Sequence, residues 1–149
     1  MDHKYFLQLA IEQAKKALDL QEVPVGAIIV HNKIIIGSGF NQKEQLKSPT
    51  AHAEIIAIKQ ASENRKDWRL TDCILYSTLE PCPMCAGAIL QARIPTIVYG
   101  ALDKRWGGCG TVVNLLDTNL FNHNVNSIYL KNNECEQLLK NFFKALRQS

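Results

Sequence analysis

The chain has 149 residues, of which 46% are hydrophobic and 21% charged, so we expect one globular domain over residues 1–149. No apolar run approaches the ~20 residues that a membrane-spanning helix requires. The net charge of +3 permits an anionic partner but is well short of that of a basic nucleic-acid arm.

The first predicted elements are a helix and a β-hairpin. Apolar residues recur at helical spacing over residues 5–18, and Asp2 is placed to cap this helix. The β-favouring run 25–30 is followed by a short turn and then by 34–36, which predicts the hairpin. A polar loop over 42–49 completes this part of the chain.

Helices and strands then alternate. Helices are predicted over 51–64 and from 81 to about 92, and strands over 73–78, 96–99 and 127–130. The predicted order is helix, hairpin, helix, strand, helix, strand, helix, strand, helix, in which the segment 112–116 lies between the last two strands. This order predicts an α/β layered domain around one sheet.

The C-terminal segment shows the clearest helical pattern of the chain. Its apolar stripe predicts a helix that packs on the sheet, and the residues of the stripe are Cys135, Leu138, Leu139, Phe142, Phe143 and Leu146.

Two short motifs carry the predicted chemistry: His52-Ala53-Glu54 and Pro81-Cys82-Pro83-Met84-Cys85. Together they supply an imidazole, a carboxyl and two thiols, an arrangement typical of zinc deaminases. Three protein ligands leave the fourth corner of a zinc tetrahedron to water, so we predict His52, Cys82 and Cys85 as the ligands. Glu54 is then the predicted proton shuttle beside a zinc-bound hydroxide that attacks the amine-bearing ring carbon.

The spacing of His52 and Glu54 constrains where they lie. Residues two apart point about 200° apart on an ideal helix, so the two side chains converge only near its start. We therefore predict His52 at the cap or first turn, with Glu54 reaching the bound water and not the zinc. A Cys-x-x-Cys pair alone would equally suit a redox pair or half of a structural zinc site.

The remaining cysteines and histidines have simpler interpretations. Cys73 begins a strand and Cys135 lies on an apolar stripe, so both are expected to be buried and inert, whereas Cys109 has no assignment. The other three histidines and the scattered basic residues are read as structural or solvated side chains. The acidic start of the chain lacks the pattern of a signal peptide, so a cytoplasmic location is expected.

Beyond these motifs, the chain resembles the bacterial tRNA adenosine deaminases along nearly its whole length. The landmarks are residues 22–27, Asn41, residues 49–54, residues 78–88, residues 122–125 and the apolar residues of the C-terminal helix. The resemblance implies a three-layer α/β/α cytidine-deaminase-like fold with a five-stranded mixed sheet, one zinc ion per subunit, and a homodimer. It also implies conversion of adenosine to inosine at the wobble position of tRNA.

The resemblance further implies substrate-binding residues. Asn41 matches the asparagine that reads the flipped purine, the backbone around Ala53 would contact the base, and Asp103 matches a position near the sugar. The chain departs from the family pattern after Asp103, with Arg105 in place of a lysine and with Trp106 and Cys109 nearby.

Two other functions stay open at this point. A deaminase of free guanine, cytosine or a nucleoside would share the zinc site. A non-catalytic, zinc-stabilised RNA-binding module has little support because Glu54 is present.

Overall fold

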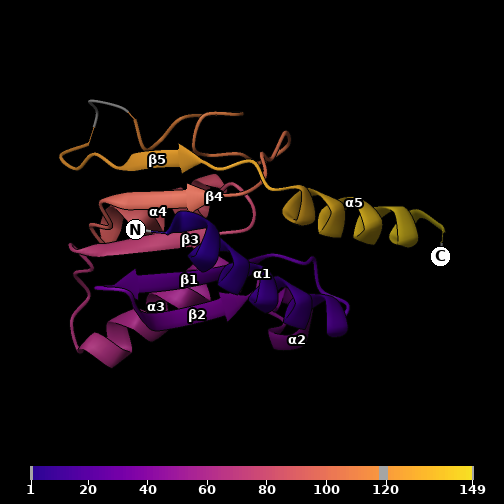
Figure 1. The fold of residues 1–149 in the computed structure, drawn as a ribbon, viewed down its shortest axis with the longest axis horizontal. Helices are drawn as coiled ribbons and strands as arrows, with labels where there is room; N and C mark the ends of the chain where they lie inside the picture. The colour runs from indigo at the N-terminus through magenta and orange to yellow at the C-terminus, as the bar shows by residue number, and fades with distance from the viewer. Residues whose placement is uncertain (1, 118–120, 149) are drawn as a thin grey trace.

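The computed structural model describes residues 2–117 and 121–148, which form a five-stranded mixed sheet flanked by helices (Figure 1). The strand order is β2-β1-β3-β4-β5. Strand β1 is antiparallel to β2 and β3, whereas β4 and β5 are parallel to β3. The strands are β1 (Gly26–His31), β2 (Ile34–Phe40), β3 (Cys73–Ser77), β4 (Thr96–Tyr99) and β5 (Asn126–Tyr129). The predicted hairpin and the predicted mixed sheet are both confirmed.

Helices cover both faces of this sheet, which confirms the three-layer arrangement. Helix α1 (His3–Asp19) lies on one face, and α3 (Ala53–Arg65) and α4 (Pro83–Gln91) lie on the other (Figure 1). Alternate strand residues point to opposite faces, so Ile28 packs towards α1 and its neighbour Ile29 towards α3 and α4.

Both helices that carry a chemical motif begin at the same edge of the sheet. Helix α4 follows the carboxyl end of β3, and α3 begins soon after β2 ends. The carboxyl end of β2 lies at this edge because β1 pairs Gly26 with Phe40 and Ala27 with Ser77. The topology therefore brings His52 and Cys82, which are 30 positions apart in the chain, to one place.

Two local predictions are corrected by the structure. The helix expected between the last two strands is absent over 112–116, where the chain forms bends and Asn114 makes an isolated bridge with Cys109. Val112 and Val113 are β-branched and lower the helix propensity of this short segment. Conversely, a short helix α2 (Lys43–Leu46) lies within the predicted polar loop.

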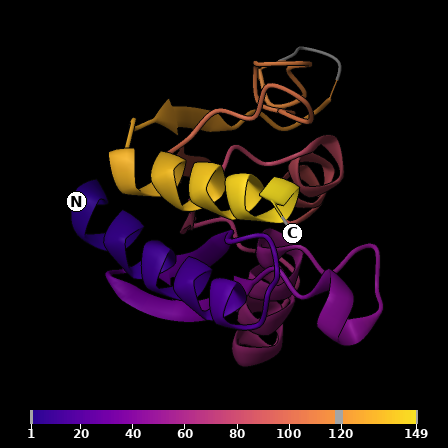
Figure 2. The same ribbon diagram turned by 90° about the vertical axis from the view of Figure 1, so that its right-hand side faces the viewer.

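The last helix, α5 (Asn133–Gln148), does not pack on the sheet as predicted. Its one buried residue is Cys135, which clusters with Ile11 of α1 and Ala101 of the loop after β4. Figure 2 shows α5 running beside α1. The apolar stripe predicts that one face is buried, but it does not say against which element.

Within the described residues, none of the helices combines the length and the apolar character that crossing a bilayer requires.

Candidate active site

Three of the predicted side chains converge at the edge where α3 and α4 begin. The Nδ1 atom of His52 lies 3.6 Å from the Sγ atoms of both Cys82 and Cys85. The three ligand atoms all lie within 4.8 Å of one another. Zinc bonds of about 2.0–2.1 Å to nitrogen and 2.3 Å to sulfur, at a tetrahedral angle, would separate these atoms by about 3.6 Å. The group therefore fits a zinc ion.

Helix ends hold these three side chains in position. His52 is the N-cap residue of α3, with extended backbone angles of φ −80° and ψ 151°, which confirms its predicted place at the helix start. Cys82 is the N-cap of α4, and Pro83 occupies the first turn with Cys85. The positive ends of both helix dipoles point at the group, which favours thiolates there.

The two thiols differ in their acidity. Hydrogen bonds from Cys85 and His52 lower the pKa of Cys82 to about 4. The same Cys82 contact, together with burial, raises the pKa of Cys85 well above its usual range. The hydrogen bond to Cys82 also raises the pKa of His52. The protein alone stabilises one thiolate, and a divalent cation would hold the second, because metals deprotonate the thiols that they coordinate.

Glu54 lies in the first turn of α3 and is 4% exposed. Burial raises the pKa of its carboxyl to about 7, against the lowering effects of backbone hydrogen bonding and of His52. Cys85 is within hydrogen-bonding reach of the carboxyl. A carboxyl of this acidity can both accept and release a proton near neutral pH.

Asn41 and Ala53, two of the predicted substrate-binding residues, are in direct contact. The Ala53 N–H donates a hydrogen bond of 2.9 Å to Oδ1 of Asn41. This bond satisfies one of the unpaired N–H groups at the start of α3, which the His52 side chain does not cap. It also fixes the Asn41 amide beside His52.

Asp103, the third predicted substrate-binding residue, organises a loop. Its Oδ1 atom accepts hydrogen bonds of 3.0 Å from the backbone N–H groups of Arg105 and Trp106. The Asp103 N–H in turn donates to Oε1 of Glu80 at 3.2 Å. The structure therefore ties this loop to the segment that precedes Cys82.

Glu80 is the residue of this region to which the sequence interpretation gave no role. Its carboxylate is 1% exposed, and its Oε2 atom accepts hydrogen bonds from the N–H groups of Cys109 (3.0 Å) and Thr111 (3.1 Å). The Thr111 hydroxyl donates to Oε1. The signal in the sequence was an acidic residue between a buried strand and Pro81, where an unpaired carboxylate would be costly.

The loop held by Glu80 packs directly on the predicted metal ligands. A Cβ atom on Gly107 would lie 2.5 Å from Oε2 of Glu80, and one on Gly108 would lie 2.8 Å from the carbonyl carbon of Cys82. The Gly108 N–H also donates to the Pro81 carbonyl at 2.8 Å. The structure shows where Cys109, which had no assignment from the sequence, lies: it is buried in this loop, and its thiol lies 3.7 Å from the Pro81 carbonyl oxygen.

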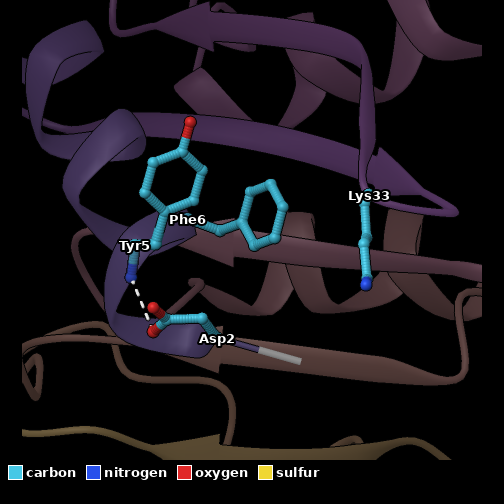
Figure 3. A pocket seen from close by; sticks show the side chains of 4 residues that line it. All are labelled: Asp2, Tyr5, Phe6 and Lys33. Carbon is cyan, nitrogen blue, oxygen red and sulfur yellow. Dashed lines mark hydrogen bonds between the residues drawn. The ribbon is translucent and has the colours of Figure 1, made fainter.

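A separate hollow lies at the other edge of the sheet. It has a volume of about 430 Å³ and is lined by Asp2, Tyr5, Phe6 and Lys33 (Figure 3). The Asp2 carboxylate is already used, because it accepts a hydrogen bond from the Tyr5 N–H and caps α1 as predicted. This hollow contains no thiol or imidazole among its described lining residues, so the ligand geometry and not the concavity identifies the candidate site.

Comparison with known proteins agrees with this geometry. A family model of MafB19-like deaminases matches residues 1–147. The tRNA-specific adenosine deaminase of Aquifex aeolicus is 46% identical over 149 residues, which cover 100% of this chain and 99% of that protein.

Two solved structures are also similar. One comes from studies of A-to-I editing by tRNA:A34 deaminases at the wobble position of transfer RNA. It has a TM-score of 0.83 and 36% identity, and the match covers 87% of this chain and 100% of that chain. The guanine deaminase of Bacillus subtilis has a TM-score of 0.67 and 32% identity, over 100% of this chain and 96% of that one. With its His-Cys-Cys group and its cytidine-deaminase-like sheet, the chain belongs to the tRNA-specific adenosine deaminase family.

Proposed function

We propose that the protein hydrolyses adenosine to inosine at the first anticodon position, the wobble position, of a tRNA. The observation that carries this proposal is the His52, Cys82 and Cys85 group with the buried Glu54 beside it, in a chain of this family. Water adds at C6 of adenine and ammonia leaves, so the reaction needs a nucleophile and a proton carrier.

His52, Cys82 and Cys85 would hold the zinc ion in this proposal. Zinc, when bound, lowers the pKa of a coordinated water molecule and so supplies the nucleophile at neutral pH. The chain supplies the proton transfers. Glu54 takes one proton from the attacking water and passes it to the ring nitrogen; it then takes the remaining proton of the added hydroxyl and passes it to the amine, so that the bond between C6 and the amine breaks and ammonia leaves. The burial of Glu54 keeps its pKa near neutrality, as this double role requires.

Asn41, Ala53 and Asp103 would bind the substrate. The hydrogen bond from Ala53 to Asn41 supports this role, because it orients the Asn41 amide next to the metal ligands. Asp103 holds the turn formed with Arg105 and Trp106. The family resemblance implies that Asp103 lies near the sugar of the bound nucleotide. An anticodon loop suits such a site, since its bases are unpaired and inexpensive to unstack.

We further propose that the chain is one deaminase domain that acts in the cytoplasm as a homodimer. The match over the full length of the Aquifex aeolicus relative supports the single domain.

The proposed dimer is supported by exposed apolar side chains beside the candidate site, which could form an interface with a second copy: Leu102, Val112 and Val113. Light scattering that gives the mass of a single chain at working concentration would contradict the dimer.

The first test is substrate choice. The purified protein is incubated with a tRNA anticodon stem-loop carrying adenosine at the first anticodon position, and separately with free adenosine, cytidine and guanine. We expect inosine, detected by mass, in the stem-loop only. Turnover of a free base with an untouched stem-loop would instead favour small-molecule deamination. This alternative is tested because the chain is also similar in structure to a guanine deaminase.

The matched variant for this test is Glu54→Gln, which keeps the size of the side chain and removes the proton acceptor. We expect it to retain zinc and to lose about 10²-fold or more of the deamination rate. Activity at the wild-type level in this variant would remove Glu54 from the proposal.

A further inference from the structure

Trp106 is the most exposed large apolar side chain among the described residues, with 67% of its surface accessible. It lies in the loop that departs from the family pattern. The backbone on either side of it is fixed, because the Trp106 N–H donates to Asp103 and the Gly107 N–H donates to the Asp103 carbonyl at 2.9 Å. An exposed indole on a well-anchored loop offers apolar area whose burial against a partner would be favourable.

The loop places this indole at the rim of the candidate active site. Trp106 is two residues from Gly108, so the Cα atoms of these two residues are at most about 8 Å apart. The Gly108 N–H donates to the carbonyl of Pro81, the residue before Cys82. The Glu80 carboxylate also holds this loop in place, because it accepts hydrogen bonds from the N–H groups of Cys109 and Thr111. We expect the nucleotides that adjoin a base held in the site to run along this rim.

We propose that Trp106 stacks on a nucleobase adjacent to the edited adenosine and so contributes to the selection of the stem-loop. This inference rests on the proposed function. Unpaired bases in RNA loops are commonly held by stacking on aromatic side chains. Lys104 and Arg105, both exposed, precede the indole and provide the positive charge that phosphates require.

The second tryptophan of the chain is a matched control. Trp68 is 51% exposed, so it is comparably accessible to solvent. Its ring already carries the Arg69 guanidinium, 4.6 Å from the ring centroid. It lies between the end of α3 and the start of β3, at the opposite edge of the sheet from the candidate site.

The binding test uses the fluorescence of each tryptophan alone, in the zinc-loaded Glu54→Gln protein, which cannot turn over the RNA. With Trp68→Phe the signal comes from Trp106, and with Trp106→Phe it comes from Trp68. We expect the stem-loop to quench Trp106 and to leave Trp68 unchanged. Stem-loops with an abasic site on the 5′ or 3′ side of the target adenosine identify the stacked base, because one of them should bind without quenching Trp106.

The kinetic test compares Trp106→Ala with Trp106→Tyr in the active protein. Loss of one base-aromatic stack corresponds to a weakening of about 5- to 150-fold, so KM for the stem-loop should rise within this range in Trp106→Ala. The value of kcat should change by less than about twofold, because the stack is equally present before and during the reaction. Trp106→Tyr should restore most of the affinity.

Several results would overturn the inference while leaving the proposed function intact. They are an unchanged KM in Trp106→Ala, an unquenched Trp106, or quenching that persists with both abasic stem-loops. A Trp106→Ala protein that loses its dimeric mass would assign the indole to an interface between copies instead. Failure of the wild-type protein to edit any stem-loop would count against the proposed function itself.

Discussion

Among the described residues, two groups of side chains of the kinds that bind metals lie at opposite ends of strand β3. Strand β3, which is five residues or about 16 Å long, begins at Cys73 of one group and leads towards Cys82 of the other. In each group the ligand atoms lie within 4.8 Å of one another. One group is His52, Cys82 and Cys85, and the other is His31, Asp72 and Cys73.

The two groups differ in the charges around them. At the amino end of β3, the Arg65 guanidinium lies 2.7 Å from the Asp72 carboxylate and already neutralises it. Burial there raises the pKa of the Cys73 thiol. At the carboxyl end, by contrast, two helix N-termini favour thiolates and the pKa of Cys82 is lowered to about 4. Proximity of suitable atoms is therefore not sufficient, because the surroundings must also favour the charged ligands.

The largest expected effect separates the two groups by metal content. His52→Ala should reduce zinc from about one per chain to nearly none and abolish deamination, because a ligand is lost from a three-ligand site. The matched control, His31→Ala, should keep both the zinc content and the deamination rate of the wild-type protein. Inductively coupled plasma mass spectrometry on chelator-washed protein provides the measurement.

Either of two results would contradict this difference between the groups. Full zinc occupancy in His52→Ala would show that the metal is held elsewhere. Two zinc ions per wild-type chain, one of them lost in His31→Ala, would show that the Arg65 ion pair does not prevent binding at the amino end of β3.

A smaller effect is expected from Glu80→Gln, which tests how the loop is attached to the catalytic edge. The amide can no longer accept every hydrogen bond from Asp103, Cys109 and Thr111, so a buried N–H group is left unpaired. The free energy of unfolding should fall by about 1–3 kcal/mol, measured by urea denaturation. Zinc content should stay at the wild-type level.

The control for this variant is Glu63→Gln, at an exposed position of α3. Its free energy of unfolding should lie within about 0.5 kcal/mol of the wild-type value. Equal stabilities of the Glu80 and Glu63 variants would mean that the buried carboxylate does not hold the loop.

The sequence predicted the zinc-ligand group well because its geometry is local. His52 and Glu54 converge only at a helix start, and Cys82 and Cys85 share one helical turn, so each half of the group follows from its own segment. The resemblance, through the cytidine-deaminase-like fold, and the alternating helices and strands also predicted the sheet that brings the two halves together. The hydrogen bond between Asn41 and Ala53 required the structure, because it joins a strand end to a helix start.

The sequence was least informative where contacts join distant segments. The sequence around Glu80 did not show that its carboxylate would accept hydrogen bonds from backbone N–H groups of residues 103–111, because these partners follow it by more than 20 positions. The amphipathic pattern of α5 correctly predicted a helix and incorrectly predicted its neighbour. Periodicity reports that a face is apolar, whereas the packing partner depends on where the preceding loop leads.

The smallest expected effect concerns the ion pair at the amino end of β3, through Asp72→Asn. Arg65 lowers the pKa of Asp72 below its ordinary value of 3.8. The pair therefore contributes stability above about pH 4 and loses it as pH falls through the depressed pKa. Asp72 is 55% exposed, so solvent screening limits the loss in Asp72→Asn at pH 7 to less than about 1 kcal/mol. Urea unfolding of both proteins from pH 7 down to pH 3 should show their stabilities converging at the acidic end, and also at pH 7 in high salt. A difference that widens towards pH 3 would mean that the carboxylate is not stabilised by Arg65, and the ion pair would then no longer explain why this end of β3 is a poor zinc site.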